Sequence, residues 1–240
     1  MEIDSREAAV YVAVIADIVA SRSIPERYAV QEALKATLAV ANERYALVLA
    51  SQFTLTLGDE FQGLLHTASN LFEMLDFIRF RHDEVTFRFG IGLGEILTAI
   101  DPRSSLGADG PAYWNARAAS EYVHHHHDYR SANMRIEAEG VLGGHDTALA
   151  NDVLRLCGFI EKRWRPSQRA FVRDYIRRNG HARDVAQKNL AMALGLSPQQ
   201  INQSIRLSGL HQYLDAKRRL SEHLQRALEK TAEKQGKDRT

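Results

Sequence analysis

Three glycines at alternate positions of one apolar segment constrain the fold more than any other feature of the chain. They are Gly90, Gly92 and Gly94 in VTFRFGIGLGEI, residues 85–96, which is typical of a β-strand. Side chains of a strand alternate between its two faces, so all three glycines face the same side. Because glycine adds no packing to a strand, we expect either a crossing helix or a ligand to approach this backbone closely.

A helix with one small-residue face is predicted directly after the glycine strand. Asp109 is a candidate N-cap, and Pro111 suits the first helical turn. The small face consists of Ala112, Ala116, Ala119 and Val123. Such a face permits the close packing that the glycine strand requires.

Strand and helix signals alternate through the first 140 residues. The β-branched run at residues 11–18 predicts a buried strand, and helical spacing of apolar residues predicts helices over 26–45 and 71–78. Further strands are predicted at 53–57, at 61–65 after a turn at 58–60, and at 132–140. This order predicts an α/β or α+β fold built on one sheet.

Composition and charge narrow the possible partners. In the 240 residues, no apolar run reaches the length of a membrane span, and the basic start of a signal peptide is missing, so we expect a cytoplasmic protein with no membrane contact. The single cysteine, Cys157, excludes an internal disulfide and is expected to be buried in a helix. Residues 161–240 hold 18 Lys and Arg against 8 Asp and Glu, whereas residues 1–160 hold 13 against 22. The basic part is a candidate for binding nucleic acid, or it attracts the acidic part of the same chain.

Two acidic segments are predicted to meet. Asp17 ends the first strand, and Asp59 and Glu60 follow Gly58 in the hairpin FTLTLGDEFQGLL, residues 53–65. Carboxylates that converge from neighbouring strands repel one another unless a cation lies between them, and such oxygen ligands suit Mg²⁺ or Mn²⁺ with bound phosphates. The alternative is that Asp17 caps the next segment while Asp59 and Glu60 form a polar turn.

The same segments resemble class III nucleotide cyclases. VIADIVASR resembles their first metal-binding segment, LGDEF resembles their glycine-aspartate hairpin and the signature hairpin of diguanylate cyclases, and RFGIGLGE resembles the strand that follows. The resemblance covers about residues 10–120 and implies a ferredoxin-like palm domain over residues 1–145. It implies Asp17 and Asp59 as metal ligands and catalytic residues, Glu60 as an auxiliary catalytic acid, Mg²⁺ or Mn²⁺ as cofactor, and a nucleoside triphosphate as ligand or substrate.

The nucleotide-binding residues implied by this resemblance are Ile18, Ser21, Arg22, Gly58, Asn115 and Arg117. Two departures from the cyclase pattern stand out. Ala20 and Ser21 replace a glycine-phenylalanine pair that cradles phosphates, and Asn115 and Arg117 are two residues apart instead of four, so they cannot share a helix face. Nucleotide binding without turnover therefore stands beside an active nucleotidyl cyclase or nucleotidyltransferase as a hypothesis.

As a whole chain, the sequence resembles the SatD family of bacterial cytoplasmic proteins. The blocks that carry this resemblance are IADIVASR, FTLTLGDEFQGLL, FRFGIGLGEI and GADGPAYWNARAA.

The basic part contains the pattern of a helix-turn-helix in QKNLAMALGLSPQQINQSIRLSG, residues 187–209. Gly195 permits the turn, Ser197 caps the second helix, Pro198 takes its first position, and Gln200 completes a capping box. The segment resembles the DNA-binding helices of sigma-type and response regulators. A structural or protein-binding helix pair is the alternative.

The second helix of this pair leaves a polar face open, which carries Gln199, Gln200, Asn202, Gln203 and Arg206. Amide side chains suit adenine edges and arginine suits guanine, so we expect this face to bind double-stranded DNA. We predict a helical linker at 146–165, an all-α helix-turn-helix domain at 166–228 and a disordered tail at 229–240. The leucine-bearing helix that starts at Leu210 either forms a homodimer or packs on its own domain.

The most economical function is a nucleotide-responsive transcriptional regulator. The alternatives are the cyclase or nucleotidyltransferase named above and a degenerate palm that serves as a scaffold for protein interaction.

Overall fold

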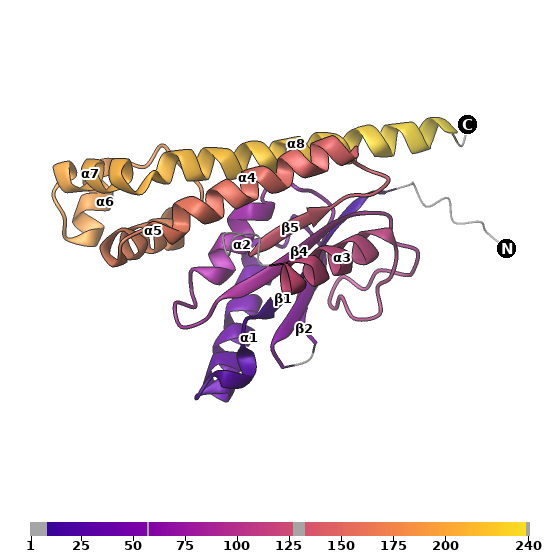
Figure 1. Cartoon of the computed structure of the whole chain (residues 1–240), viewed down its shortest axis with the longest axis horizontal. Coiled ribbons are helices and arrows are strands. Elements are labelled where there is room, and N and C mark those ends of the chain that lie inside the picture. The colour runs from indigo at the N-terminus through magenta and orange to yellow at the C-terminus, as the bar shows by residue number, and fades with distance from the viewer. Residues whose placement is uncertain (1–8, 57, 127–132, 239–240) are drawn as a thin grey trace.

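A five-stranded mixed sheet with helices on both faces forms the centre of the protein (Figure 1). The computed structural model describes residues 9–56, 58–126 and 133–238. The strands are β1 (Tyr11–Ile18), β2 (Leu49–Leu55), β3 (Glu60–Leu65), β4 (Phe87–Gly94) and β5 (Met134–Glu137), in the order β2-β3-β1-β4-β5. All neighbours are antiparallel except β4 and β5, which are parallel. The predicted mixed α/β architecture is confirmed.

The helices divide between the two faces of the sheet. They are α1 (Arg27–Arg44), α2 (Leu71–Arg79), α3 (Pro111–His125), α4 (Gly144–Lys162), α5 (Pro166–Asn179), α6 (Gln187–Leu194), α7 (Pro198–Ser208) and α8 (Leu210–Asp238), with a short 3₁₀ turn, η1 (Ser21–Ser23), after β1. The core of one face joins β1 through Val12 and Val14 to α1, α2, α4 and α8. The core of the other face joins β1 through Ala13 and Ile15 to α3. Both faces of β1 are therefore buried, which explains its nearly continuous apolar sequence.

The close approach at the glycine strand is made by a helix. A Cβ atom on Gly90 would lie 2.2 Å from the carbonyl oxygen of Ala116, and one on Gly92 would lie 2.1 Å from the carbonyl oxygen of Ala112. The small face of α3 therefore rests on the backbone of β4, as the alternate glycines predicted, and no space for a ligand is left between them. The cap of α3 differs from the prediction, because Gly110 occupies the N-cap position and Asp109 accepts a hydrogen bond from the Trp114 indole.

Buried asparagines fix both edge strands to helices. Asn42 of α1 exchanges two hydrogen bonds with the backbone of Phe53 in β2. Asn151 of α4 does the same with Ile136 in β5. An amide side chain can both donate and accept hydrogen bonds, so it occupies the backbone positions that a further strand would use. α4 is consequently held against the sheet by polar as well as apolar contacts.

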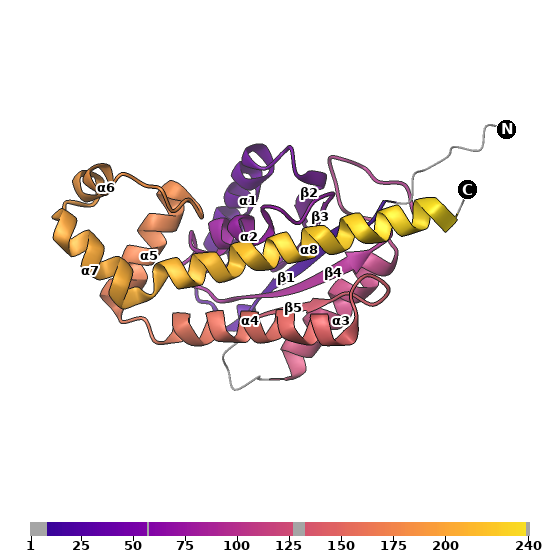
Figure 2. The same cartoon turned by 90° about the horizontal axis from the view of Figure 1, so that it is seen from above.

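A second apolar core lies at one end of the molecule, between α4, α5, α6, α7 and the start of α8 (Figures 1 and 2). Phe80, which follows α2, and the predicted buried Cys157 belong to it. Residues 146–165, predicted as a linker, lie mainly in α4, whose Ala150 and Leu154 belong to the core of the sheet. The segment is helical, and it packs on the core of the sheet.

The structure of α8 differs from the prediction for the C-terminal part of the chain. Leu220, Leu224 and Leu228 are buried in the core of the sheet, so they do not form a free dimerisation face. Residues 229–238 continue the helix where a disordered tail was predicted, and Gln235 donates a hydrogen bond to Glu95. Within the described residues, no helix is both long and apolar enough to cross a membrane.

Candidate functional site

Asp17 lies beside Glu60 and Arg88 at the end of β1. The strand register pairs Asp17 with Glu60 on β3 and with Arg88 on β4. The Arg88 guanidinium donates from Nε at 2.8 Å and lies with Nη2 at 2.7 Å from the same oxygen, Oδ1 of Asp17. Glu60 accepts a hydrogen bond of 3.1 Å from the Thr56 hydroxyl. The positive charge expected beside Asp17 is thus supplied by an arginine of the protein itself.

Asp59 has different partners on the hairpin turn. Its carboxylate accepts a hydrogen bond from the Ser21 hydroxyl, and its other oxygen lies 3.6 Å from Arg27. The backbone carbonyl of Asp59 accepts from the amide of Ile18 at 3.2 Å, so the turn is adjacent to the end of β1. Gly58 has a φ of 68°, the left-handed conformation that favours glycine. The structure therefore places Asp17 and Asp59 on adjacent segments, but their carboxylates share no partner among the described residues.

The loop after β1 contains a residue other than glycine in the left-handed backbone conformation. Ala20 has a φ of 53° and a ψ of 34°, which is the left-handed region and costs a residue with a Cβ about 1–2 kcal/mol. The cyclase pattern has a glycine at this position, and glycine adopts this conformation easily. Ala20 adopts it although it carries a Cβ atom. The buried Ser21 follows it and Arg22 is exposed. Strain of this kind is retained where the surrounding structure fixes the loop.

The two predicted site residues on α3, Asn115 and Arg117, have different surroundings. Arg117 lines a shallow pocket together with Asp17, Glu60 and Ser120. Asn115 instead donates to the carbonyl of Leu93 at 2.8 Å, which ties α3 to β4. Because the two residues are only two positions apart, they do not share a face of α3, as the sequence indicated. Asn115 therefore has a structural role, and of the two only Arg117 lines the pocket with Asp17.

The acidic edge does not fit a resident divalent metal as it stands. Among the described residues, no group of three or more His, Cys, Asp or Glu side chains is placed to share one ion. The carboxylate of Asp17 is bound to Arg88, and that of Asp59 to Ser21 and Arg27. Hard divalent cations need several oxygen ligands, and these arginines already neutralise the acids.

Sequence reasoning missed the two arginines that pair with the acids. Arg88 lies between Phe87 and Phe89 in an otherwise apolar strand, and it stands opposite Asp17 once the register is known. A charged residue inside a buried strand is the signal that would have identified it. Arg27 gives no such signal, because it begins α1 among other polar residues.

α7 lies at the end of the molecule opposite the C-terminal part of α8 (Figure 1), and its polar face is exposed to solvent. All five predicted residues, Gln199, Gln200, Asn202, Gln203 and Arg206, are exposed. The turn between α6 and α7 has Gly195 at a φ of 65°, and Ser197 and Gln200 form the predicted capping box. Ile201 faces inward and is fully buried. Gln187 of α6 donates to Asn202 at 2.7 Å, which fixes one side chain of this face.

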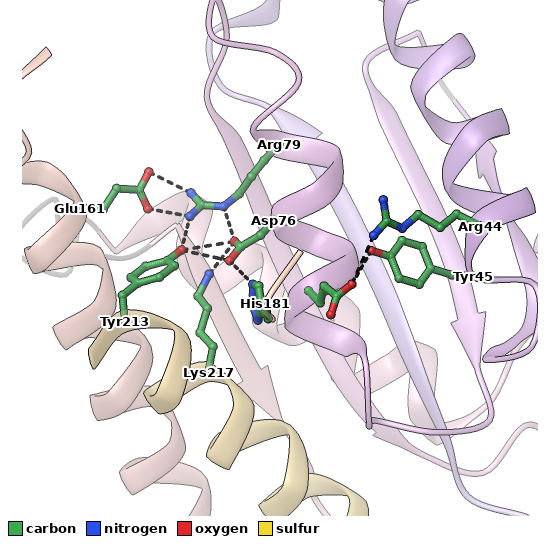
Figure 3. A network of polar contacts seen from close by, with 9 residues as sticks. Arg44, Tyr45, Asp76, Arg79, Glu161, His181, Tyr213 and Lys217 are labelled. Carbon is green, nitrogen blue, oxygen red and sulfur yellow. Dashed lines mark hydrogen bonds and ion pairs between the residues drawn. The ribbon is translucent and has the colours of Figure 1, made fainter. Parts of the chain in front are cut away.

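A buried polar network joins α2 to the helices around it (Figure 3). Fully buried Asp76 accepts hydrogen bonds from Lys217 at 2.6 Å, Arg79 at 2.7 Å and His181 at 2.9 Å. Arg79 also donates to both oxygens of Glu161 in α4, at 2.9 and 2.7 Å. The network thus connects α2, α4, α8 and the segment after α5 through charged groups.

The electrostatics of the network favour the ionised form of its acids. Burial alone would raise the pKa of Asp76, but the charges of Lys217 and Arg79 and the hydrogen bond from His181 hold it well below its usual range. Burial alone would also raise the pKa of Glu161, but the charge of Arg79 and its hydrogen bond more than offset this effect. The pKa of Glu161 is therefore below its usual value. The network therefore carries paired charges in the interior, where losing one partner is costly.

Comparisons with known proteins identify the family. The model of the SatD family matches residues 11–224, from the first residue of β1 to within α8. A search of the curated proteins returned no match. The match covers both the sheet and the helices that surround α7, so the resemblance noted in the sequence extends over nearly all the described structure. The chain therefore belongs to the SatD family.

Proposed function

We propose that this chain is a DNA-binding regulator that reads double-stranded DNA with α7 and binds a nucleotide at the edge of its sheet. The observation that carries the proposal is the exposed polar face of α7, held on a helix that is fixed at both ends. Ser197 and Gln200 cap the start of α7. At its end, the Trp164 indole donates to the carbonyl of Ser208 at 2.7 Å. A rigid helix with amide and guanidinium groups facing outward suits the major groove.

Exposed basic residues on α5 and α6, the two helices that contact α7 from the preceding part of the chain, support contact with DNA phosphates. Arg177 and Arg178 on α5 and Lys188 on α6 are exposed. Arg173 and Arg183 are less suitable, because Arg173 pairs with Asp83 and Asp174, and Arg183 pairs with Asp215. We therefore assign backbone contacts to the three exposed residues. Binding through them weakens as the salt concentration rises.

The nucleotide proposal rests on the connectivity of the sheet and on the loop after β1. In support of it, the succession β1-α1-β2-β3-α2-β4 is similar to the split βαβ arrangement of ferredoxin-like domains, with β5 beside β4. Exposed Arg22 and pocket-lining Arg117 are available for phosphates. Because Arg88 already neutralises Asp17, binding without metal-dependent turnover is the more economical form of the proposal.

Arg206→Ala tests the DNA proposal. Duplexes selected from a random pool by the wild-type protein are titrated with each variant at fixed salt. We expect Arg206→Ala to weaken specific binding by about 1–3 kcal/mol, the contribution of one arginine-guanine pair. Arg226→Ala is the matched control, because Arg226 is exposed on the part of α8 that packs on the sheet. Equal affinity of the two variants, or no enriched sequence, would refute the proposal for α7.

A thermal-shift titration tests the nucleotide proposal separately. ATP, GTP, CTP and UTP are added with and without Mg²⁺ or Mn²⁺, and each mixture is analysed for product. We expect one nucleotide to raise the Tm of the wild type without forming product, and Arg117→Ala to lose the shift, since a ligand that binds only the native state stabilises it. Metal-dependent product that Asp17→Ala abolishes would establish the enzyme instead.

A further inference from the structure

α4 carries a row of exposed apolar side chains on the face turned away from the sheet. Leu149, Leu156 and Phe159 are 53%, 63% and 51% exposed. Among the described residues, no other helix or strand carries as many exposed large apolar side chains. The opposite face of α4 is buried through Ala150 and Leu154, and α8 lies along its side (Figure 2). Single exposed leucines are ordinary on a protein surface, but a row of them on one helix face is typical of a surface that binds a partner.

The row belongs to a stripe with the spacing of a helix that packs against another helix. The positions of this stripe are separated alternately by four and three residues, which keeps them on one face of α4. In chain order they are His145, Leu149, Asp152, Leu156, Phe159 and Arg163. At its end, the Arg163 guanidinium lies over the Phe159 ring, 5.1 Å from the centroid. The same alternation of three and four forms the seam of a coiled coil.

The stripe is complementary to itself when two copies run antiparallel. Positions 149 and 159 are equally distant from position 154, and so are positions 152 and 156. A two-fold axis at position 154 would therefore place Leu149 opposite Phe159 of the second copy. The two Leu156 side chains would then lie beside the axis, about one helical turn apart. All three large apolar side chains of each copy are thereby covered by the other copy.

The charges next to the seam favour the antiparallel orientation. Asp152 forms an ion pair with Arg155 of the same helix. In an antiparallel pair, the two ion pairs would meet on one side of the seam, with each Asp152 next to Arg155 of the other copy. In a parallel pair, the two Asp152 carboxylates would face each other and repel. Each copy contributes a pair that is already neutral, so the contact does not depend on an unpaired arginine.

We propose that α4 joins two copies of this chain in a symmetric antiparallel dimer, with Leu149, Leu156 and Phe159 at its centre. A two-fold axis is the commonest symmetry of homo-oligomers, and it uses the same surface on both copies. Because three apolar side chains per copy make a small contact, we expect a Kd on the order of 10–100 µM. The stripe lies outside the DNA and nucleotide sites proposed above, so the proposal does not depend on them.

Sedimentation velocity of the full chain, from about 1 to 300 µM, measures the association. The wild type is expected to shift from monomer toward dimer over this range. Leu156→Glu should raise the Kd at least about tenfold, because it removes an apolar contact and places a carboxylate opposite Asp152 of the other copy. Val40→Glu is the matched control, since Val40 is an exposed apolar residue of another helix, α1, and it should change the Kd less than about twofold.

Oxidative cross-linking tests the orientation. A mixture of the Leu149→Cys and Phe159→Cys proteins should form a disulfide dimer faster than either variant alone, because the antiparallel pair places these two positions opposite each other. The wild type, whose only cysteine is the buried Cys157, measures the background.

Three results would overturn the proposal. They are a wild type that stays monomeric at the highest concentration, an equal effect of Leu156→Glu and Val40→Glu on the Kd, and faster cross-linking of either cysteine variant with itself. A monomeric wild type that sediments with phosphatidylcholine vesicles, whereas Leu156→Glu does not, would assign the stripe to a lipid surface instead.

Discussion

The carbonyl oxygen of Ala112 and the amide nitrogen of Ala116 occupy the place where a side chain on Gly92 would begin. A Cβ atom there would lie 2.1 Å from each of them. Both atoms belong to the backbone of α3, so they cannot move aside as a flexible side chain does. The contact between β4 and α3 thus depends on the absence of a single methyl group.

We expect Gly92→Ala to lower the free energy of unfolding by about 1–3 kcal/mol or more, the usual cost of overpacking a well-packed core. Urea denaturation followed by circular dichroism measures it. Gly144→Ala is the control, because no atom lies within 4 Å of its added Cβ atom and alanine favours the helix. An equally small effect of both substitutions would contradict the packing described for α3.

Single residues also show what the sequence could and could not predict. Alternate glycines in a strand predict that another group lies close to the strand backbone, so the contact between β4 and α3 could be expected from the sequence. The pairing of Asp17 with Arg88 was not, because it depends on the register of two strands separated by some 70 positions along the chain. Residue types indicate which groups need a partner, whereas the topology decides which partner they receive.

At the scale of elements, α7 is the best example of a helix defined by local signals. The Ser197 hydroxyl accepts a hydrogen bond from the backbone amide of Gln200, and the side-chain oxygen of Gln200 accepts one from the backbone amide of Ser197. Pro198 and Gly209 stand at its two ends. These contacts span three or four residues, and for that reason the sequence alone predicted them.

Ser197→Ala removes the cap of α7. We expect a loss of about 1 kcal/mol in the free energy of unfolding, because an amide at the start of the helix loses its acceptor. Ser197→Asp should retain most of the stability, since aspartate is an equally good N-cap. Chemical denaturation of the three proteins at neutral pH provides the measurement. A loss of similar size in Ser197→Asp would show that packing, and not capping, explains the effect.

α8 shows the limit of local signals. The leucine spacing predicted a helix with one apolar face, and the helix exists. The same spacing does not specify the surface that covers this face, so a dimer and a packed terminal helix were equally consistent with it. Leu220, Leu224 and Leu228 pack on the sheet, which is long-range information. The polar end of α8 stays helical as a continuation of that packed segment.

In the whole molecule, the buried network holds the sheet and the helical end together. Asp76 comes from α2, Glu161 from α4 and Lys217 from α8. No sequence pattern predicted this, because Asp76 sits in an apolar stripe and its partners His181 and Lys217 lie 105 and 141 positions away in the chain. The network therefore crosses the predicted boundary between a palm domain and a helical domain.

Asp76→Asn leaves Lys217 buried without a carboxylate, and we expect a loss of about 3–5 kcal/mol in the free energy of unfolding at pH 7. Asp215→Asn on the surface of α8 is the control and should cost less than about 1 kcal/mol. Because the pKa of Asp76 is lowered in the folded state, its contribution is complete above the unfolded pKa of about 4 and declines as the pH falls below it. The difference between wild type and Asp76→Asn should therefore shrink from pH 4 to pH 2. A constant difference would indicate that the pKa of Asp76 is the same in the folded and unfolded states, and a difference that grows as the pH falls would indicate that Asp76 is protonated in the folded protein.

The hydrogen bond from Trp164 to Ser208 ties the end of α7 to the segment between α4 and α5. A protein that reads DNA with α7 would then hold its sheet on one fixed side of the duplex. DNA turns once in about 10–10.5 base pairs, so inserting about 5 base pairs beside the bound site would carry the sheet to the opposite side. Any neighbour that touches the sheet on DNA would thus be sensitive to helical phase, and insertions of a full turn would restore the contact that half a turn destroys.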